Sequence, residues 1–197
     1  MRTQGSGEST LLLLDAIQVL RTENVEYAIV GALAASVHGV IRASRDADAL
    51  LSIGTSALKG LEQSFKTAGF GTELRRGDMS DPIGAVLSLH DKFENRVDLL
   101  VGIRGFDPAA FSRVIEVAFN GESLKFVGLE DFVAMKLFAG GPQDIVDAQN
   151  ALEAAPEPPD ASLLRQLVTR YGRDTAESLE NILRELDHDP NSGLELD

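Results

Sequence analysis

The sequence predicts a mixed α/β or α+β fold, and three observations support this prediction. Five short apolar runs are typical of buried strands, and segments with helical periodicity separate them. From Leu129 onward the chain is predicted to be wholly helical. With 197 residues, 44% of them apolar, the chain is long enough to bury a substantial core. We expect a mixed five-stranded sheet flanked by helices, followed by a C-terminal helical extension.

The elements of the first part follow from apolar runs and turn residues. Residues 1–8 are polar, and Ser9 or Thr10 can cap a helix that ends near Asn24. The apolar run at residues 27–30 stops at Gly31, as expected of a buried strand, and an alanine-rich helix at residues 32–37 then closes at a glycine. The further elements expected are strands at residues 47–53, 85–90, 97–101 and 124–127, and a helix at residues 56–68.

The C-terminal part is predicted to consist of helices. Glu130 and Asp131 stand in the first turn of a helix that begins at Leu129, where the helix dipole favours acids. A second helix covers residues 144–152, and the prolines that follow cannot continue it. Two amphipathic helices at residues 162–171 and 175–186 complete the chain. We therefore expect a domain at residues 1–153, a linker at residues 154–160, and a helical extension with a loose tail at residues 161–197.

Composition and charge limit the classes of function. The chain has no cysteine, which excludes disulfides and thiolate metal sites and fits a reducing compartment. The apolar run at residues 11–14 is too short for a signal peptide or a membrane span, so we expect a cytoplasmic protein that does not bind a membrane. A formal charge of −13 repels polyanions, which disfavours binding to duplex DNA.

Two aspartates, Asp46 and Asp48, stand two residues apart at the head of an apolar strand. On a strand this spacing puts both carboxylates on one face. The pair alone is not specific, because chance yields such a pair and another occurs at Asp187 and Asp189. The context of the first pair is distinctive, since ionised carboxylates on a buried strand are costly unless a cation or hydrogen-bond donors compensate them.

A third carboxylate, Asp98, is embedded in the apolar strand at residues 97–101. If the two strands are neighbours, Asp98 meets Asp46 and Asp48, and three carboxylates offer the hard oxygen ligands that suit Mg²⁺ or Mn²⁺. Such a cluster is typical of the protein side of a two-metal phosphoryl-transfer site. For Asp98 taken alone, a role at a strand end or sheet edge is equally consistent with the sequence.

The stretch that begins Val30-Gly31-Ala32 and reaches the Asp-x-Asp pair forms a wider pattern. A glycine turn leads into a short helix that ends in Gly39, and an Arg-x-Ser step at residues 42–44 precedes the two acids. This pattern resembles the signature of the nucleotidyltransferase superfamily, in the version found in minimal AbiEii-like toxin proteins. Residues 128–139 and 144–147 are similar to the later lysine-bearing and aspartate-bearing helices of that family.

The resemblance implies a role for each matched residue. The backbone at Gly31 and Ala32 would approach a nucleoside triphosphate at a helix N-terminus, where free amides favour anions. Asp46, Asp48 and Asp98 would bind Mg²⁺ or Mn²⁺, and Asp98 would help to deprotonate the acceptor hydroxyl. The remaining residues are Arg42 and Ser44, which would line the entrance or brace the loop, and Lys136, which either pairs with phosphate or is a snorkelling surface lysine.

The function expected from the resemblance is transfer of a nucleoside monophosphate from a triphosphate to an acceptor hydroxyl. The acceptor that it implies is a tRNA end, a protein or a small molecule. The sequence departs from the family pattern at three places: Ala32 replaces the second glycine or serine of the turn, Ala47 and Ala49 replace bulkier aliphatic residues, and residues 140–143 lack the basic residues usual before Asp144. The missing basic residues favour an alternative. That alternative is a catalytically weak binding or regulatory module with a protein partner, such as a toxin–antitoxin component. A third interpretation is an α/β protein whose strand-end acids serve solubility.

Overall fold

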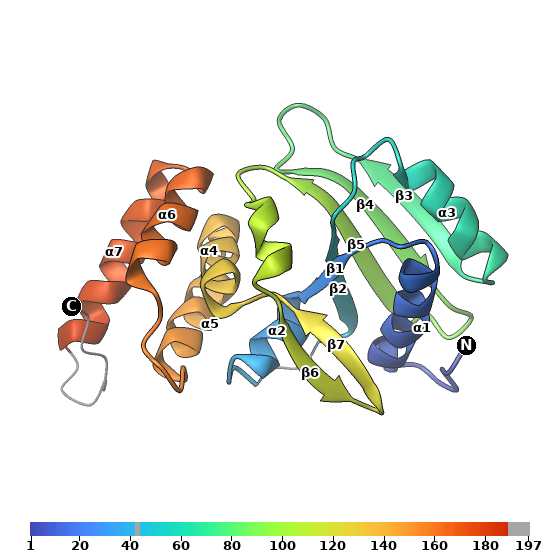
Figure 1. Cartoon of the computed structure of the whole chain (residues 1–197), viewed down its shortest axis with the longest axis horizontal. Coiled ribbons are helices and arrows are strands. Elements are labelled where there is room, and N and C mark those ends of the chain that lie inside the picture. The colour runs from blue at the N-terminus through green and yellow to red at the C-terminus, as the bar shows by residue number, and fades with distance from the viewer. Residues whose placement is uncertain (42–43, 189–197) are drawn as a thin grey trace. The chain divides into compact units, whose positions relative to one another are not determined.

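A computed structural model describes residues 1–41 and 44–188, and the described residues divide into two compact units that alternate along the sequence. Unit 1 comprises Met1–Leu33, residues 44–104 and Glu116–Phe126, and unit 2 comprises residues 34–41, Gly105–Ile115 and residues 127–188. Figure 1 shows the elements of both units along the chain. No helix in these ranges is long and apolar enough to cross a membrane.

Unit 1 is built on a mixed sheet that has seven strands within the described residues. The strands are β1 (Tyr27–Val30), β2 (Asp46–Leu51), β3 (Gly71–Arg76), β4 (Ile83–His90), β5 (Arg96–Ile103), β6 (Ile115–Phe119) and β7 (Glu122–Phe126). Their order across the sheet is β3-β4-β5-β2-β1-β7-β6. The central strands β2 and β5 are parallel, and β2 is antiparallel to β1 on its other side.

The prediction of five strands was wrong in number, because β3 and β6 were not expected. Both are edge strands, and most of their side chains are partly or fully exposed. The other five strands were identified by a buried apolar run. The edge strand β3, which contains Glu73 and Arg75, has no such run. The five expected strands are all present.

Two helices of unit 1 cover the sheet. They are α1 (Ser9–Thr22) and α3 (Leu58–Thr67). The first packs against β2 and β5, the second packs against β3 and β4, and the two helices also contact each other. Leu13, Ile17 and Phe65 are fully buried in this layer. A short helix, α2 (Gly31–Val37), follows β1 directly.

Unit 2 is mainly helical, as the sequence predicted for the chain after Leu129. Its helices are α4 (Leu129–Ala139), α5 (Pro142–Glu153), α6 (Ala161–Tyr171) and α7 (Arg173–His188), and a short 3₁₀ helix, η1, spans Pro108–Ser112. The helix α4 packs against α5, α6 and α7. Residues 154–160 form neither helix nor strand, while the predicted domain boundary at this segment stays a prediction.

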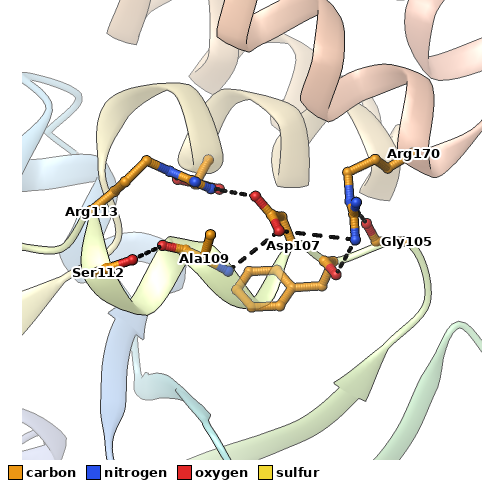
Figure 2. A network of polar contacts seen from close by, with 8 residues as sticks. Gly105, Asp107, Ala109, Ser112, Arg113 and Arg170 are labelled. Carbon is orange, nitrogen blue, oxygen red and sulfur yellow. Dashed lines mark hydrogen bonds and ion pairs between the residues drawn. The ribbon is translucent and has the colours of Figure 1, made fainter.

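An arginine-centred network fixes the segment around η1 within unit 2 (Figure 2). The Arg113 guanidinium donates to both carboxylate oxygens of Asp131, at 2.9 and 2.8 Å, and to Asp107 at 2.9 Å. These hydrogen bonds, with Asp131 first, raise the pKa of Arg113, so its charge is permanent. Arg170 donates to the carbonyl oxygen of Gly105 at 3.1 Å, which ties the same segment to α6. The segment around η1 is thus held in place by ion pairs and hydrogen bonds.

Substitution of Gly105 tests this packing. Gly105 has a left-handed backbone conformation, and a side chain there would collide with the backbone of Arg170. Its φ is +81°, and a Cβ there would lie 2.7 Å from the Arg170 carbonyl oxygen. Gly121 has a similar φ of +79° with nothing within 4 Å, so Gly121→Ala isolates the conformational cost, about 1 kcal/mol. We expect Gly105→Ala to reduce the free energy of unfolding by about 1–3 kcal/mol more than that, measured by chemical denaturation. Equal losses in the two variants would contradict the contact.

Candidate functional site

The two central parallel strands of unit 1 carry the three predicted acids. In the β2–β5 register, Asp48 stands opposite Asp98 and Asp46 stands opposite Arg96. Residues directly opposite on neighbouring strands point to the same face, and residues two apart on one strand do so as well. The structure therefore brings Asp46, Asp48 and Asp98 onto one face of the sheet, at the ends where both strands begin.

The burial of the neighbouring residues separates the two faces of these strands. Ala47 and Ala49 are 2% and 0% exposed, and their register partners Val97 and Leu99 are fully buried. On the other face Asp46 is exposed, and Asp48 and Asp98 are of intermediate exposure. Solvent therefore reaches the acids, which removes much of the cost of keeping them ionised.

Arg96 is the cation that the structure places beside the acids. Its Nε donates to Asp98 Oδ1 at 2.9 Å, and its Nη2 donates to Ser88 Oγ at 3.0 Å. Ser88 belongs to β4, where it stands opposite Asp98. The hydrogen bond to Asp98 is the main cause of a raised pKa for the Arg96 guanidinium. Asp98 thus has a defined partner on its own strand and face.

The prediction that one ion binds all three acids stays a prediction. Among the described residues, no group of three or more His, Cys, Asp or Glu side chains is arranged so that it could hold a metal ion. Arg96, which holds Asp98, also donates to Ser88 on β4, the neighbour of β5 on the side away from β2. The chemistry of the donors nevertheless suits a hard cation, because carboxylate oxygens are the ligands that Mg²⁺ and Mn²⁺ prefer.

Gly31 lies beside Asp48, and this contact gives a physical reason for glycine that the sequence did not reveal. A Cβ on Gly31 would lie 2.2 Å from Asp48 Oδ2, and the backbone φ of Gly31 is +64°. A side chain is therefore excluded by the carboxylate as well as by the backbone. Gly31 and Ala32, which is buried, open α2, and their predicted contact with a triphosphate stays a prediction.

Ser44 precedes β2 and hydrogen-bonds the backbone of its first residue. Its Oγ donates to the carbonyl oxygen of Asp46 at 2.8 Å and accepts from the Asp46 amide at 3.3 Å. This local turn is consistent with bracing the loop before the acids, one of the two roles expected for Ser44. Arg42, the other residue of the Arg-x-Ser step, lies outside the described residues.

Lys136 belongs to unit 2 and is not the snorkelling surface lysine that the sequence left open. It is 8% exposed, and its Nζ lies 2.8 Å from both Asp144 Oδ1 and Asp147 Oδ2. Asp147 is fully buried and also accepts a hydrogen bond from Gln143 at 2.9 Å. This ion pair links α4 to α5, and a phosphate contact by Lys136, which stays a prediction, would have to compete with two carboxylates.

Sequence reasoning missed two polar residues of the acid face, Arg96 and Ser88. The strand period of two was sufficient to find Arg96, because it stands two residues before Asp98 and therefore points to the same face. Ser88 had no such signal, since its position depends on the pairing of β4 with β5.

Comparison with solved structures identifies the architecture. No protein-family model matches the chain, and no curated protein sequence matches it. The antibiotic-resistance factor ANT(2'')-Ia, in its solution structure, superposes with a TM-score of 0.58 at 14% identity, covering 92% of this chain and 97% of its own. The chain has the nucleotidyltransferase fold. Two further crystal structures agree with this result.

The first of these is an antigenic nucleotidyltransferase-like protein from Paracoccidioides brasiliensis, with a TM-score of 0.54 at 16% identity over 98% of this chain and 97% of that one. The second is ANT(2'')-Ia in complex with adenylyl-2''-tobramycin, with a TM-score of 0.56 at 14% identity over 83% and 96%. At such identities the likeness establishes the nucleotidyltransferase fold. Membership of the AbiEii-like group stays a prediction.

The contact between Gly31 and Asp48 predicts an energetic coupling. Gly31→Ala should lower the free energy of unfolding by about 1 kcal/mol from the positive φ, and by more because the Asp48 carboxylate must move. In an Asp48→Ala background the second part should vanish, giving a coupling of about 0.5–3 kcal/mol in a double-mutant cycle. Gly69→Ala, with φ +90° and no atom within 4 Å, is the control and should show no coupling to Asp48→Ala. A cost of Gly31→Ala that is the same in both backgrounds would exclude Asp48 as the cause.

The buried ion pair of Lys136 predicts a large loss of stability on its removal. Lys136→Met leaves the fully buried Asp147 carboxylate without its cation, and we expect a loss of about 3–5 kcal/mol in chemical denaturation. Lys66→Met, which removes the pair of a 49% exposed lysine with Glu62, is the matched control and should cost less than about 1 kcal/mol. Similar losses in the two variants would mean that Lys136 is not a structural residue.

Proposed function

We propose that the chain is a metal-dependent nucleotidyltransferase, which moves a nucleoside monophosphate from a triphosphate to an acceptor hydroxyl. One observation supports this above the others. On two neighbouring strands of a nucleotidyltransferase fold, Asp48 stands opposite Asp98, and Asp46 shares their face. Carboxylates so placed are suited to phosphoryl transfer, which needs little from a protein beyond positioning and charge stabilisation.

The donor set fits the Mg²⁺ or Mn²⁺ that this function implies. Asp46, Asp48 and Asp98 supply only oxygen ligands, and the missing Cβ of Gly31 gives the Asp48 carboxylate its space. When bound, the metal would supply positive charge to the phosphate oxygens and lower the pKa of the acceptor hydroxyl. The backbone at Gly31 and Ala32, with Ser44, is proposed to contact the triphosphate. Contacts from Arg42 and Lys136 are part of the same proposal.

The proposed reaction is an in-line displacement at the α-phosphorus. The acceptor oxygen forms the new bond, the bond to pyrophosphate breaks, and the hydroxyl proton passes to the carboxylate of Asp98. Asp98 suits this role because it is only partly buried, so an acceptor can reach it. Nucleoside triphosphates are abundant in the cytoplasm, and we propose that compartment as well.

A small hydroxylated molecule is the acceptor that the charge of the chain favours. A formal charge of −13 repels a tRNA end, whereas a neutral or cationic small molecule carries no such penalty. ANT(2'')-Ia, which has the same fold, has been solved with adenylyl-2''-tobramycin. Tobramycin is therefore the first acceptor to test, followed by tRNA and a protein lysate.

The alternative, a catalytically weak binding or regulatory module such as a toxin–antitoxin component, is also supported by one observation. In the part of the chain that the structure describes, Asp98 is engaged by Arg96 and no three-acid metal arrangement is present. A module of this kind would bind a nucleotide or a protein partner without transferring phosphate.

The proposed function predicts metal-dependent stabilisation by a triphosphate. Mn²⁺ and one of the four triphosphates, at a hundredfold excess over the dissociation constant, should raise the free energy of unfolding of the wild type by about 2.7 kcal/mol. This gain would be measured as a higher melting temperature. Asp48→Asn should abolish that gain and the transfer of labelled nucleotide to tobramycin, tRNA or lysate. Glu26→Gln, which removes one charge just before β1, at the end away from Asp48, should leave both unchanged.

The outcomes separate the two functions. Stabilisation and transfer that both depend on Asp48 support the enzyme. Stabilisation without transfer into any acceptor supports the binding module. A wild type with neither metal-dependent stabilisation nor transfer contradicts the proposed function.

A further inference from the structure

Arg96 occupies an unusual position for an exposed arginine. Its side chain is 48% exposed, yet two of its nitrogens have defined partners, Asp98 on its own strand and Ser88 on the neighbouring strand. The register places Asp46 on one side of Arg96 and His90 on the other. Glu73 on β3, opposite Ser88, adds to the negative field that acts on the guanidinium. Arg96 thus lies on a face that carries several acids.

The exposure of this ion pair distinguishes it from the buried pairs of the same chain. Arg113 is bound to Asp131, whose side chain is only 4% exposed, so that separating the pair would leave a buried charge. The Asp98 side chain is 19% exposed and the Arg96 side chain is 48% exposed, so water reaches both partners. Exposed ion pairs contribute little net stability, so exchange of the partner of Asp98 is inexpensive.

We propose that Arg96 is a displaceable counterion, which holds the Asp98 carboxylate when no metal is bound and releases it when a divalent cation binds. This inference rests on the proposed function. A divalent cation that took Asp98 as a ligand would stand next to a full positive charge on the same carboxylate, and the two repel. Metal binding therefore favours release of Arg96, and the presence of Arg96 weakens metal binding. Arg96 is a positioning residue, since it acts through Asp98.

The experiment is a titration of the full-length, EDTA-treated protein with Mn²⁺ alone, followed by electron paramagnetic resonance of the free ion. Arg96→Gln removes the competing charge, and we expect it to bind Mn²⁺ about fivefold more tightly than the wild type, the upper end of what an exposed ion pair contributes. Arg96→Lys keeps a charge without the planar fork, and its affinity should lie between the two.

The matched control is Arg21→Gln. Arg21 also pairs with a carboxylate, Glu122, at 2.8 Å, and is 41% exposed, but Glu122 lies on β7, separated from β5 by β2 and β1. The substitution makes the same change in net charge, so Mn²⁺ affinity should stay within about twofold of the wild type if only local charge matters. A second readout needs no metal binding curve: at one Mn²⁺ concentration, the rise in melting temperature caused by Mn²⁺ should be larger for Arg96→Gln than for the wild type.

The outcomes of the Mn²⁺ titrations distinguish failure of the exchange from failure of the proposed function. If the wild type binds Mn²⁺ and Arg96→Gln binds it equally or more weakly, the exchange is wrong while the proposed function stands. An equal gain in Arg21→Gln would also overturn the exchange, because net charge alone would explain it. If neither the wild type nor Arg96→Gln binds Mn²⁺ alone, the exchange is overturned, while the proposed function is decided by the test with Mn²⁺ and a triphosphate. Should Arg96→Gln not fold, Arg96→Met, which keeps the aliphatic stem without the charge, takes its place.

Discussion

Repulsion between like charges on β2 and β5 is the constraint to which the rest of the acid face responds. The pairing that puts Asp48 opposite Asp98 is fixed from the other face of the sheet, where Ala47 and Leu99 are fully or almost fully buried. A slip of one residue would expose the apolar set and bury the acids, so the register cannot relax to separate the charges. The core on one face therefore imposes an unfavourable arrangement on the other. Compensation has to come from side chains rather than from a change in pairing.

Arg96 supplies a compensating charge, whereas Gly31 supplies only space. Arg96 places a positive charge on Asp98 from the same strand, through the period of two that also aligns the acids. Gly31 leaves space next to Asp48, because any Cβ there would strike the carboxylate. Like charges held on neighbouring strands are not what stability alone would favour, and such departures are typical of functional sites.

Features that depend on a single strand or helix could be predicted from the sequence. Features that depend on the pairing of strands or the packing of helices could not. The buried strands and the helices after Leu129 follow from period and apolar runs, and the common face of Asp46 and Asp48 follows from their spacing. The edge strands β3 and β6 were missed because neither is buried. Ser88 and the partners of Lys136 could not be predicted either, since those contacts join elements whose packing the sequence does not state.

The two kinds of ion pair in the chain indicate where chemistry can occur. In unit 2, Arg113 and Lys136 each neutralise a carboxylate that is nearly or fully buried, and removing either cation would leave an uncompensated charge in the interior. Separating either pair would therefore be costly, and any ligand of Lys136 would have to compete with Asp144 and Asp147. The pair of Arg96 with Asp98 is the opposite case, since water can solvate both partners during an exchange. A fold shared at 14–16% identity does not specify an activity. The proposed exchange would free the Asp98 carboxylate for the proposed metal, because Arg96 is the partner that it would have to give up.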